Sequence, residues 1–362
     1  MRLVLAAAAA ALLSLAAPAF AQDKVLNVYN WSDYVDPKMI ERFTAETGIK
    51  VNYDVYDSLE TLEAKLTAGH SGYDVVVPTS EPTFSRLVKA GALRSLDRLD
   101  IPDWSGLDPA LMKRVETSDP GNGHGVIYMW GTIGLGILPD KVTALAPDAP
   151  ADSWDLLLKP ENARRLASCG ISVLDSAIDV VPSVLKYLGR DPASASAADL
   201  ADAEKTLMAI RPFIRTFATA GAVEALASGD TCLALSYSGD VVQASARAKE
   251  AGRPAPQYVA PREFAQLWFD MLAIPADAPH PAEAERFIAF MLQPDVEAAN
   301  TDATRYPNAV PASYPKVDEA VRADPNVFPP QSAFGRFFTV AAPSQAADRA
   351  RTRMWARFKA GR

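Results

Sequence analysis

The sequence predicts an α/β protein of two lobes, each with a mostly parallel sheet flanked by helices. Short apolar runs alternate with segments of helical periodicity along most of the chain, and this alternation is typical of parallel sheets. A length of 362 residues is long for a single core and sufficient for two. Two longer apolar runs, 126–138 and 267–274, are expected to be extended segments that cross between the lobes.

These two crossing runs divide the chain. We expect residues 22–131 and 268–302 to form lobe 1, and residues 132–267 and 303–362 to form lobe 2. The three glycines of the first run would let it bend and pack closely.

A secretory leader precedes both lobes. Arg2 is followed by an apolar stretch, Leu3–Leu15, and by the small-residue site Ala19-Phe20-Ala21. This pattern predicts a signal peptide over residues 1–21 that is cleaved after Ala21. No Cys follows the cut and no later apolar run approaches the length of a membrane span, so we expect neither a lipid anchor nor membrane insertion.

The first lobe is organised around its first strand. Val25–Tyr29 is a short apolar run that leads into the aromatic and polar cluster Asn30–Tyr34. Pro37 is expected to begin a helix that Gly48 ends. The next predicted elements are a strand over 49–55, a helix over 59–69, a strand over 74–77 and a helix that contains Leu87.

The second lobe repeats the alternation of strands and helices. Trp154 and its neighbours are expected to cap a helix that ends near Pro160, and Gly189 is expected to end another. The predicted strands are 171–174 and 231–236, and the predicted helices are 180–188, 197–210, 281–292 and 348–359. A further helix is expected after the Tyr237–Asp240 segment and through Lys249.

Net charge and cysteine content limit the partners and the compartment. The chain carries a net charge of −8, which argues against nucleic acid and against anionic membranes and suits a cationic ligand. Cys169 and Cys232 are the two cysteines, and export favours a disulfide between them over two buried thiols.

Catalytic and metal-binding patterns are poorly supported. His70, His124 and His280 each lie beside Gly, Asn or Pro, so we expect solvated loop side chains and no metal site. The Ser183–Lys186 segment matches SxxK, but it lies within an amphipathic helix and has no companion motif.

Carboxylates and aromatic side chains instead recur just after predicted strands, where open α/β sheets bind ligands. Considered singly, each Trp is more often a core residue and each Asp a helix cap. Asp270 is the exception, because it lies between Trp268-Phe269 and Met271-Leu272, where an unpaired charge costs several kcal/mol. A cationic group should therefore meet Asp270.

The chain resembles the periplasmic polyamine-binding proteins of bacterial ABC importers, which are receptors for putrescine and spermidine. The similarity extends over nearly all of the sequence after the leader. The segments that carry it are YNWSDYVDP (29–37), YDVVVPTS (73–80), YMWGTIGLG (128–136), DSWDLLLKPEN (152–162), SCGISVLD (168–175), SGDTCLALSYSGD (228–240) and RTRMWARFKAG (351–361).

The resemblance implies a type II clamshell, in which two α/β lobes close on a ligand, and it implies a periplasmic monomer that delivers polyamine to an ABC permease. Trp31 and Tyr306 would flank the methylene chain, and Asp240 with Asp270 would bind the amine at one end. The complete set of implied ligand-binding residues is Trp31, Ser32, Asp33, Tyr34, Thr79, Glu81, Asp179, Thr219, Tyr237, Asp240, Trp268, Asp270 and Tyr306.

The pattern leaves the preferred ligand open. Within the implied site, Asp33 and Asp179 would serve the second amine, and Ser32 and Thr79 would offer hydroxyl groups. Glu81 and Trp268 favour a triamine, whereas Asp240 and Ser176 resemble the putrescine type.

Two other functional classes also stay open. A receptor of the same fold for agmatine or 4-aminobutyrate would need Arg305 if the ligand carries a carboxylate. A secreted hydrolase is less well supported, because the sequence shows no set of nucleophile and base.

Overall fold

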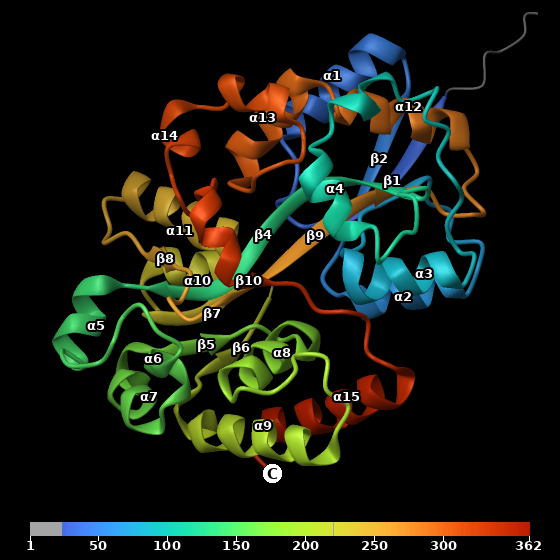
Figure 1. The fold of residues 1–362 in the computed structure, drawn as a ribbon. Helices are drawn as coiled ribbons and strands as arrows, with labels where there is room; N and C mark the ends of the chain where they lie inside the picture. The colour runs from blue at the N-terminus through green and yellow to red at the C-terminus, as the bar shows by residue number, and fades with distance from the viewer. Residues whose placement is uncertain (1–23, 220) are drawn as a thin grey trace, which may run out of the picture.

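A computed structural model describes residues 24–219 and 221–362. The predicted signal peptide therefore lies outside the described residues. In Figure 1 the strands of the first part of the chain occupy the upper half of the molecule, and β5, β6 and α15 occupy the lower half. The long strands β4 (Gly125–Ile137) and β9 (Ala265–Ala273) run between the two halves, as predicted for the crossing segments.

The ten strands of the described chain form one mixed sheet in the order β2-β1-β3-β9-β4-β7-β5-β6, with β10 beside β9 and β8 beside β4. β1 is parallel to β2 and β3, and β5 is parallel to β6 and β7. β4 and β9 are antiparallel to each other and join the two parallel groups. The remaining strands are β1 (Val25–Trp31), β2 (Lys50–Tyr56), β3 (Val75–Val76), β5 (Ile171–Val173), β6 (Thr216–Phe217), β7 (Leu233–Tyr237), β8 (Gln257–Val259) and β10 (Phe337–Phe338).

The helices cover the faces of this sheet. Their ends follow local chemistry: for α1, the Asp36 side chain accepts a hydrogen bond from the Lys38 amide, and Gly48 ends the helix with φ of 70°. The helices are α1 (Pro37–Thr47), α2 (Leu59–Thr67), α3 (Ser85–Lys89), α4 (Pro109–Val115), α5 (Pro139–Leu145), α6 (Asp155–Leu158), α7 (Pro160–Leu166), α8 (Ala177–Tyr187), α9 (Ala197–Ile210), α10 (Ala222–Ser228), α11 (Ser238–Glu250), α12 (Pro281–Met291), α13 (Pro294–Thr304), α14 (Glu319–Arg322) and α15 (Gln345–Ala360).

The crossing strands are also the centre of the core. Every residue of β4 and of β9 is buried. Hydrogen bonds near this core cross the predicted boundary between the lobes. The Pro307 carbonyl accepts one from the Trp130 amide, and the Asn308 side chain donates one to Thr301. Residues assigned by sequence to lobe 2 thus contact residues assigned to lobe 1, and the division of the chain stays a prediction.

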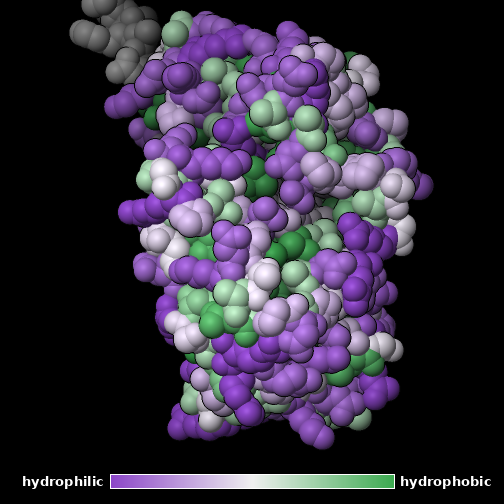
Figure 2. Space-filling model, turned by 90° about the vertical axis from the view of Figure 1, so that its left-hand side faces the viewer, coloured by the Kyte–Doolittle hydropathy of each residue, from purple (hydrophilic) through white to green (hydrophobic). Residues whose placement is uncertain are grey.

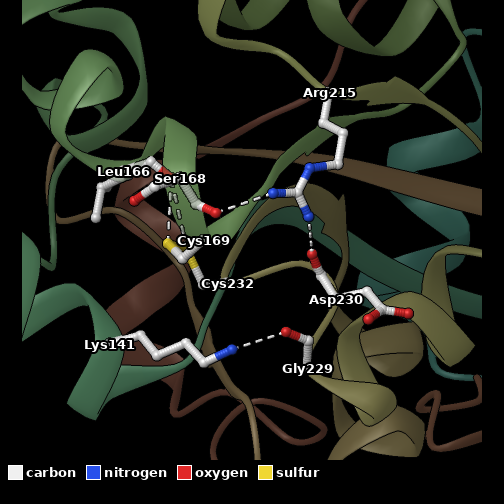
Figure 3. Close-up of a disulfide and its surroundings, with 8 residues drawn as sticks. All are labelled: Lys141, Leu166, Ser168, Cys169, Arg215, Gly229, Asp230 and Cys232. Atoms are coloured by element: carbon white, nitrogen blue, oxygen red, sulfur yellow. Dashed lines mark hydrogen bonds between the residues drawn. A yellow bond between two sulfur atoms is a disulfide. The ribbon is translucent and has the colours of Figure 1, made fainter.

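Cys169 and Cys232 form a disulfide, as the sequence favoured, with Cα atoms 5.6 Å apart (Figure 3). The bond joins the segments that lead into β5 and β7. The Arg215 guanidinium adds hydrogen bonds to the carbonyls of Ser168 and Asp230, so a cross-link and a cation hold the same neighbouring loops.

The face of the molecule in Figure 2 is mostly hydrophilic, with hydrophobic residues showing chiefly around its middle. In the described part of the chain, no helix has both the length and the apolar character to cross a membrane.

Candidate ligand-binding site

A cavity of about 410 Å³ lies beside the crossing strands and draws its walls from segments of both halves. Twelve of the thirteen residues implied by the resemblance line it. They are Trp31, Ser32, Asp33, Tyr34, Thr79, Asp179, Thr219, Tyr237, Asp240, Trp268, Asp270 and Tyr306.

The loop after β1 supplies one wall. The Trp31 indole donates from Nε1 to the Val77 carbonyl at 3.1 Å, and its ring lies 4.5 Å from the ring of Tyr56. Asp33 has φ of 54°, in the left-handed region that Asp tolerates better than most residues. This turn leaves Ser32 and Asp33 exposed at the edge of the cavity, while Tyr34 is buried.

Asp270 projects from the middle of β9 and is only 4% exposed. Its Oδ1 accepts a hydrogen bond from Thr79 Oγ1 at 2.6 Å. Burial raises the pKa of Asp270 to about 7, because the surroundings solvate the carboxylate poorly.

Asp240 lies in the first turn of α11 and is hydrogen-bonded to Tyr306. The Tyr306 hydroxyl donates to Asp240 Oδ1 at 2.7 Å, and burial raises the pKa of Asp240 to about 6. Gly239 makes this contact possible, since a Cβ atom there would lie 2.5 Å from the Tyr306 ring. The glycine of the SGD sequence is therefore required by the close approach of an aromatic ring.

Asp179 lies in the first turn of α8. Its Oδ2 accepts hydrogen bonds from the Tyr237 hydroxyl at 2.7 Å and from Ser176 Oγ at 2.6 Å. Burial raises the pKa of Asp179 above the ordinary value. In the described residues no Lys or Arg forms an ion pair with Asp179, Asp240 or Asp270, whereas the exposed Asp33 lies 3.7 Å from Arg247.

Aromatic rings fill the space between these acids. The Trp268 ring lies 5.1 Å from that of Tyr306 and 5.7 Å from that of Tyr237, both edge to face. Tyr34 packs edge to face on Tyr306 at 5.5 Å. Trp268 fits against β4 because Gly131 has no side chain; a Cβ there would lie 2.6 Å from the indole. The cavity thus combines acceptor oxygens with aromatic faces.

Comparison with known proteins places this architecture in a family. The model of the bacterial extracellular solute-binding proteins matches residues 38–329. The chain belongs to this family. It is a bacterial extracellular solute-binding protein, and its type II fold is the one that the resemblance implied.

Several relatives match over nearly their whole length. The chain is 46% identical over 344 residues to the putrescine-binding periplasmic protein SpuD of Pseudomonas aeruginosa, with 94% of each chain covered. It is 45% identical over 345 residues to the putrescine-binding periplasmic protein PotF of Escherichia coli, covering 94% of this chain and 93% of that one. A solved structure described as a spermidine/putrescine ABC transporter of Listeria monocytogenes has a TM-score of 0.84 at 26% identity, covering 94% of this chain and all of that one.

In this solute-binding protein, the thirteenth implied residue, Glu81, does not line the cavity. Its carboxylate accepts hydrogen bonds from Ser85 Oγ at 2.7 Å and from Ser118 Oγ at 2.8 Å, and it borders a neighbouring cavity. A ligand role for Glu81 at the main cavity therefore has no geometric support. Arg305, the candidate partner for a ligand carboxylate, is also absent from the walls, and Arg247 is present in them.

Sequence reasoning missed eight further wall residues. They are Tyr56, Asp57, Leu59, Gly221, Val223, Glu224, Gln243 and Arg247. Asp57 directly follows β2. The expectation that ligand-binding residues follow the ends of strands, which identified Thr79, could therefore have identified Asp57 as well. Glu224 and Arg247 lie on α10 and α11, and no local pattern distinguishes them from solvent-facing helix residues.

Two histidines are partly exposed, as expected for loop side chains, and each also contacts a buried aspartate. His124 Nδ1 lies 2.8 Å from Asp119, and His280 Nδ1 lies 3.1 Å from Asp74. Both aspartates are completely buried, and buried carboxylates need hydrogen-bond donors. Ser183 of the SxxK match is also fully buried, so it presents no nucleophile to a ligand.

Proposed function

We propose that this protein is a periplasmic receptor that binds a polyamine, putrescine or spermidine, and delivers it to an ABC permease. The observation that carries the proposal is a set of three carboxylates, the buried Asp179 and Asp270 and the half-buried Asp240, none of which forms an ion pair with a Lys or Arg of the described chain. The names of the relatives that are 46% and 45% identical support it.

A flexible dication fits this arrangement. Ammonium groups donate charge-assisted hydrogen bonds to carboxylates, which are strongest where water is excluded. The methylene chain between them would pack against the rings of Trp31, Trp268 and Tyr306. An ammonium group placed over the face of one of these rings would add a cation–π attraction of about 0.5–2 kcal/mol.

We infer that the acids serve the two ends in pairs. Burial is the main cause that raises the pKa of Asp240 and of Asp270; the charge of Asp33 adds a smaller increase at Asp240, and that of Asp179 a smaller increase at Asp270. One ammonium would sit at Asp240 and Asp33, and the other at Asp270 and Asp179. This assignment differs from the one implied by the resemblance, in which Asp240 and Asp270 share an end.

The experiment is titration calorimetry of residues 22–362 with putrescine, cadaverine, spermidine and agmatine. We expect saturable one-to-one binding of at least one of them. Absence of both heat and thermal stabilisation with all four amines would exclude the proposed function.

A second candidate, a zwitterion such as 4-aminobutyrate, is favoured by one observation: Arg247 lines the cavity and offers a guanidinium to a carboxylate. Competition separates the candidates. Displacement of bound putrescine by agmatine but not by 4-aminobutyrate supports the polyamine receptor, and the reverse order supports the zwitterion.

We infer further that the protein acts as a monomeric receptor without turnover, exported and cleaved after Ala21. Mass spectrometry of the secreted protein should give an N-terminus at Gln22. Light scattering should give the mass of one chain, and bound amine should be recovered unchanged.

A further inference from the structure

Three residues on one face of α11 line the ligand cavity at spacings of three and four positions. They are Asp240, Gln243 and Arg247. Side chains that are three or four positions apart are neighbours on the surface of a helix. A carboxylate, an amide and a guanidinium therefore follow one another along this wall, and Gln243 lies next to the proposed ammonium partner Asp240.

The Gln243 side chain is held in one orientation. It is 8% exposed, and its Nε2 donates a hydrogen bond to the Thr304 carbonyl at 2.8 Å. A carbonyl can only accept, so this contact identifies the nitrogen of the amide and turns Oε1 away from Thr304. Oε1 accepts no hydrogen bond from the described residues, and it is not enclosed as Gln266 Oε1 is, so it is open to the cavity that the side chain lines.

The neighbours of this oxygen leave it available to a ligand. Arg247, one turn further along α11, pairs with Asp33 at 3.7 Å. Asp240 Oδ1 accepts a hydrogen bond from Tyr306, while Asp240 Oδ2 has no hydrogen-bond partner in the described part of the chain. This end of the cavity thus offers acceptor oxygens from Asp240, Asp33 and Gln243.

We propose that Gln243 determines specificity by accepting the third hydrogen bond of a primary ammonium group bound at Asp240 and Asp33, so that the site selects unsubstituted terminal amines. A primary ammonium carries three N–H donors, and hydrogen bonds from a charged donor are stronger than neutral ones. N-methylation replaces one donor with a methyl group and would leave the amide oxygen against carbon. This inference rests on the proposed polyamine function and adds to it the discrimination between primary and N-substituted amines.

The test compares putrescine with N,N′-dimethylputrescine by titration calorimetry at pH 7.5, with and without Gln243→Met. Both nitrogens of the second amine are methylated, so reversing the ligand in the cavity cannot present a primary ammonium to Gln243. We expect the unmodified protein to bind putrescine at least about tenfold tighter than the dimethyl compound. Gln243→Met should weaken putrescine about tenfold and the dimethyl compound at most about twofold, so that the preference falls at least about fivefold.

The preference distinguishes ligand contact from a purely structural role. Loss of the Thr304 hydrogen bond alone would weaken both amines by the same factor and leave the preference unchanged, which would overturn the proposal. Gln243→Glu keeps an oxygen acceptor at the same reach and should keep the preference. It supplies the test if thermal unfolding without ligand shows that Gln243→Met is not folded, and equal binding of the two amines by Gln243→Glu would then count against the proposal.

Gln257→Met is the matched control, because Gln257 lies on β8, is exposed and does not line the ligand cavity. It should change neither affinity. If putrescine binds the unmodified protein and the preference for it persists in Gln243→Met, the receptor function stands and only the role of Gln243 is lost. If neither amine binds the unmodified protein, the receptor function itself fails.

Discussion

Thr79 donates a 2.6 Å hydrogen bond to Asp270 although 191 residues separate them in the chain. The contact joins the loop after β3 to the middle of crossing strand β9. It fixes the orientation of the carboxylate whose pKa rises to about 7. The acid whose pKa rises to about 7 is therefore positioned by a contact between segments that are far apart in the sequence.

Asp270→Asn should weaken putrescine binding at least about tenfold, because an ammonium buried beside a neutral amide loses its charged partner. Calorimetry measures the change, and thermal unfolding without ligand checks that the fold survives. Affinity equal to that of the unmodified protein would remove Asp270 from the site.

Polyamine affinity should fall as the pH decreases from 8 to 5. The raised pKa values, about 7 for Asp270 and about 6 for Asp240, mean that protons must leave these carboxyls before they pair with ammonium groups. Binding at pH 6.5 should release protons, which calorimetry detects as a dependence of the heat on buffer ionisation enthalpy. Asp270→Asn should abolish most of this release, and an unchanged proton count in that variant would contradict the assignment.

Glu297 on α13 should destabilise the protein at alkaline pH. Its side chain is fully buried, neither carboxylate oxygen has a hydrogen-bond partner among the described residues, and burial raises its pKa well above the usual range. The unfolded chain therefore releases this proton more readily than the folded one, so stability is lost as the pH rises above the unfolded value of about 4.3.

Glu297→Gln should remove this loss and raise the free energy of unfolding at pH 8 by about 1 kcal/mol or more, with little change at pH 4. Denaturant titration at both pH values measures the effect. The exposed Glu319→Gln on α14 is the control and should change neither. Equal effects of Glu297→Gln at the two pH values would show that ionisation is not the cause.

Replacing the disulfide with Cys169→Ala and Cys232→Ala should lower the free energy of unfolding by about 4 kcal/mol, given the sequence separation of 63 residues, because the unfolded chain gains conformational freedom. Putrescine affinity should stay within about twofold, since neither cysteine lines the ligand cavity. A large loss of affinity in a folded double variant would show that the bridge shapes the site.

Local chemistry was sufficient for much of this fold. Pro37 and Gly48 bound α1 as predicted, residues 197–210 form a helix with the predicted ends, and the apolar runs around Gly131 and Asp270 are the crossing strands. Most cavity residues could be identified from the sequence because they follow strand ends. The carboxyl ends of neighbouring parallel strands lie at one edge of a sheet, so residues just after them lie close together.

Tertiary structure alone decided the rest. Glu81 follows a strand just as Thr79 does, yet its carboxylate accepts hydrogen bonds from the nearby Ser85 and from Ser118, and the position of Ser118 is not encoded in the sequence around Glu81. Arg247 reaches the cavity from α11 and Glu224 from α10, a helix that the sequence analysis did not predict. The raised pKa values arise from desolvation, which depends on every segment that packs around a carboxyl. Periodicity and capping act over a few residues, whereas burial and charge pairing are set by distant parts of the chain.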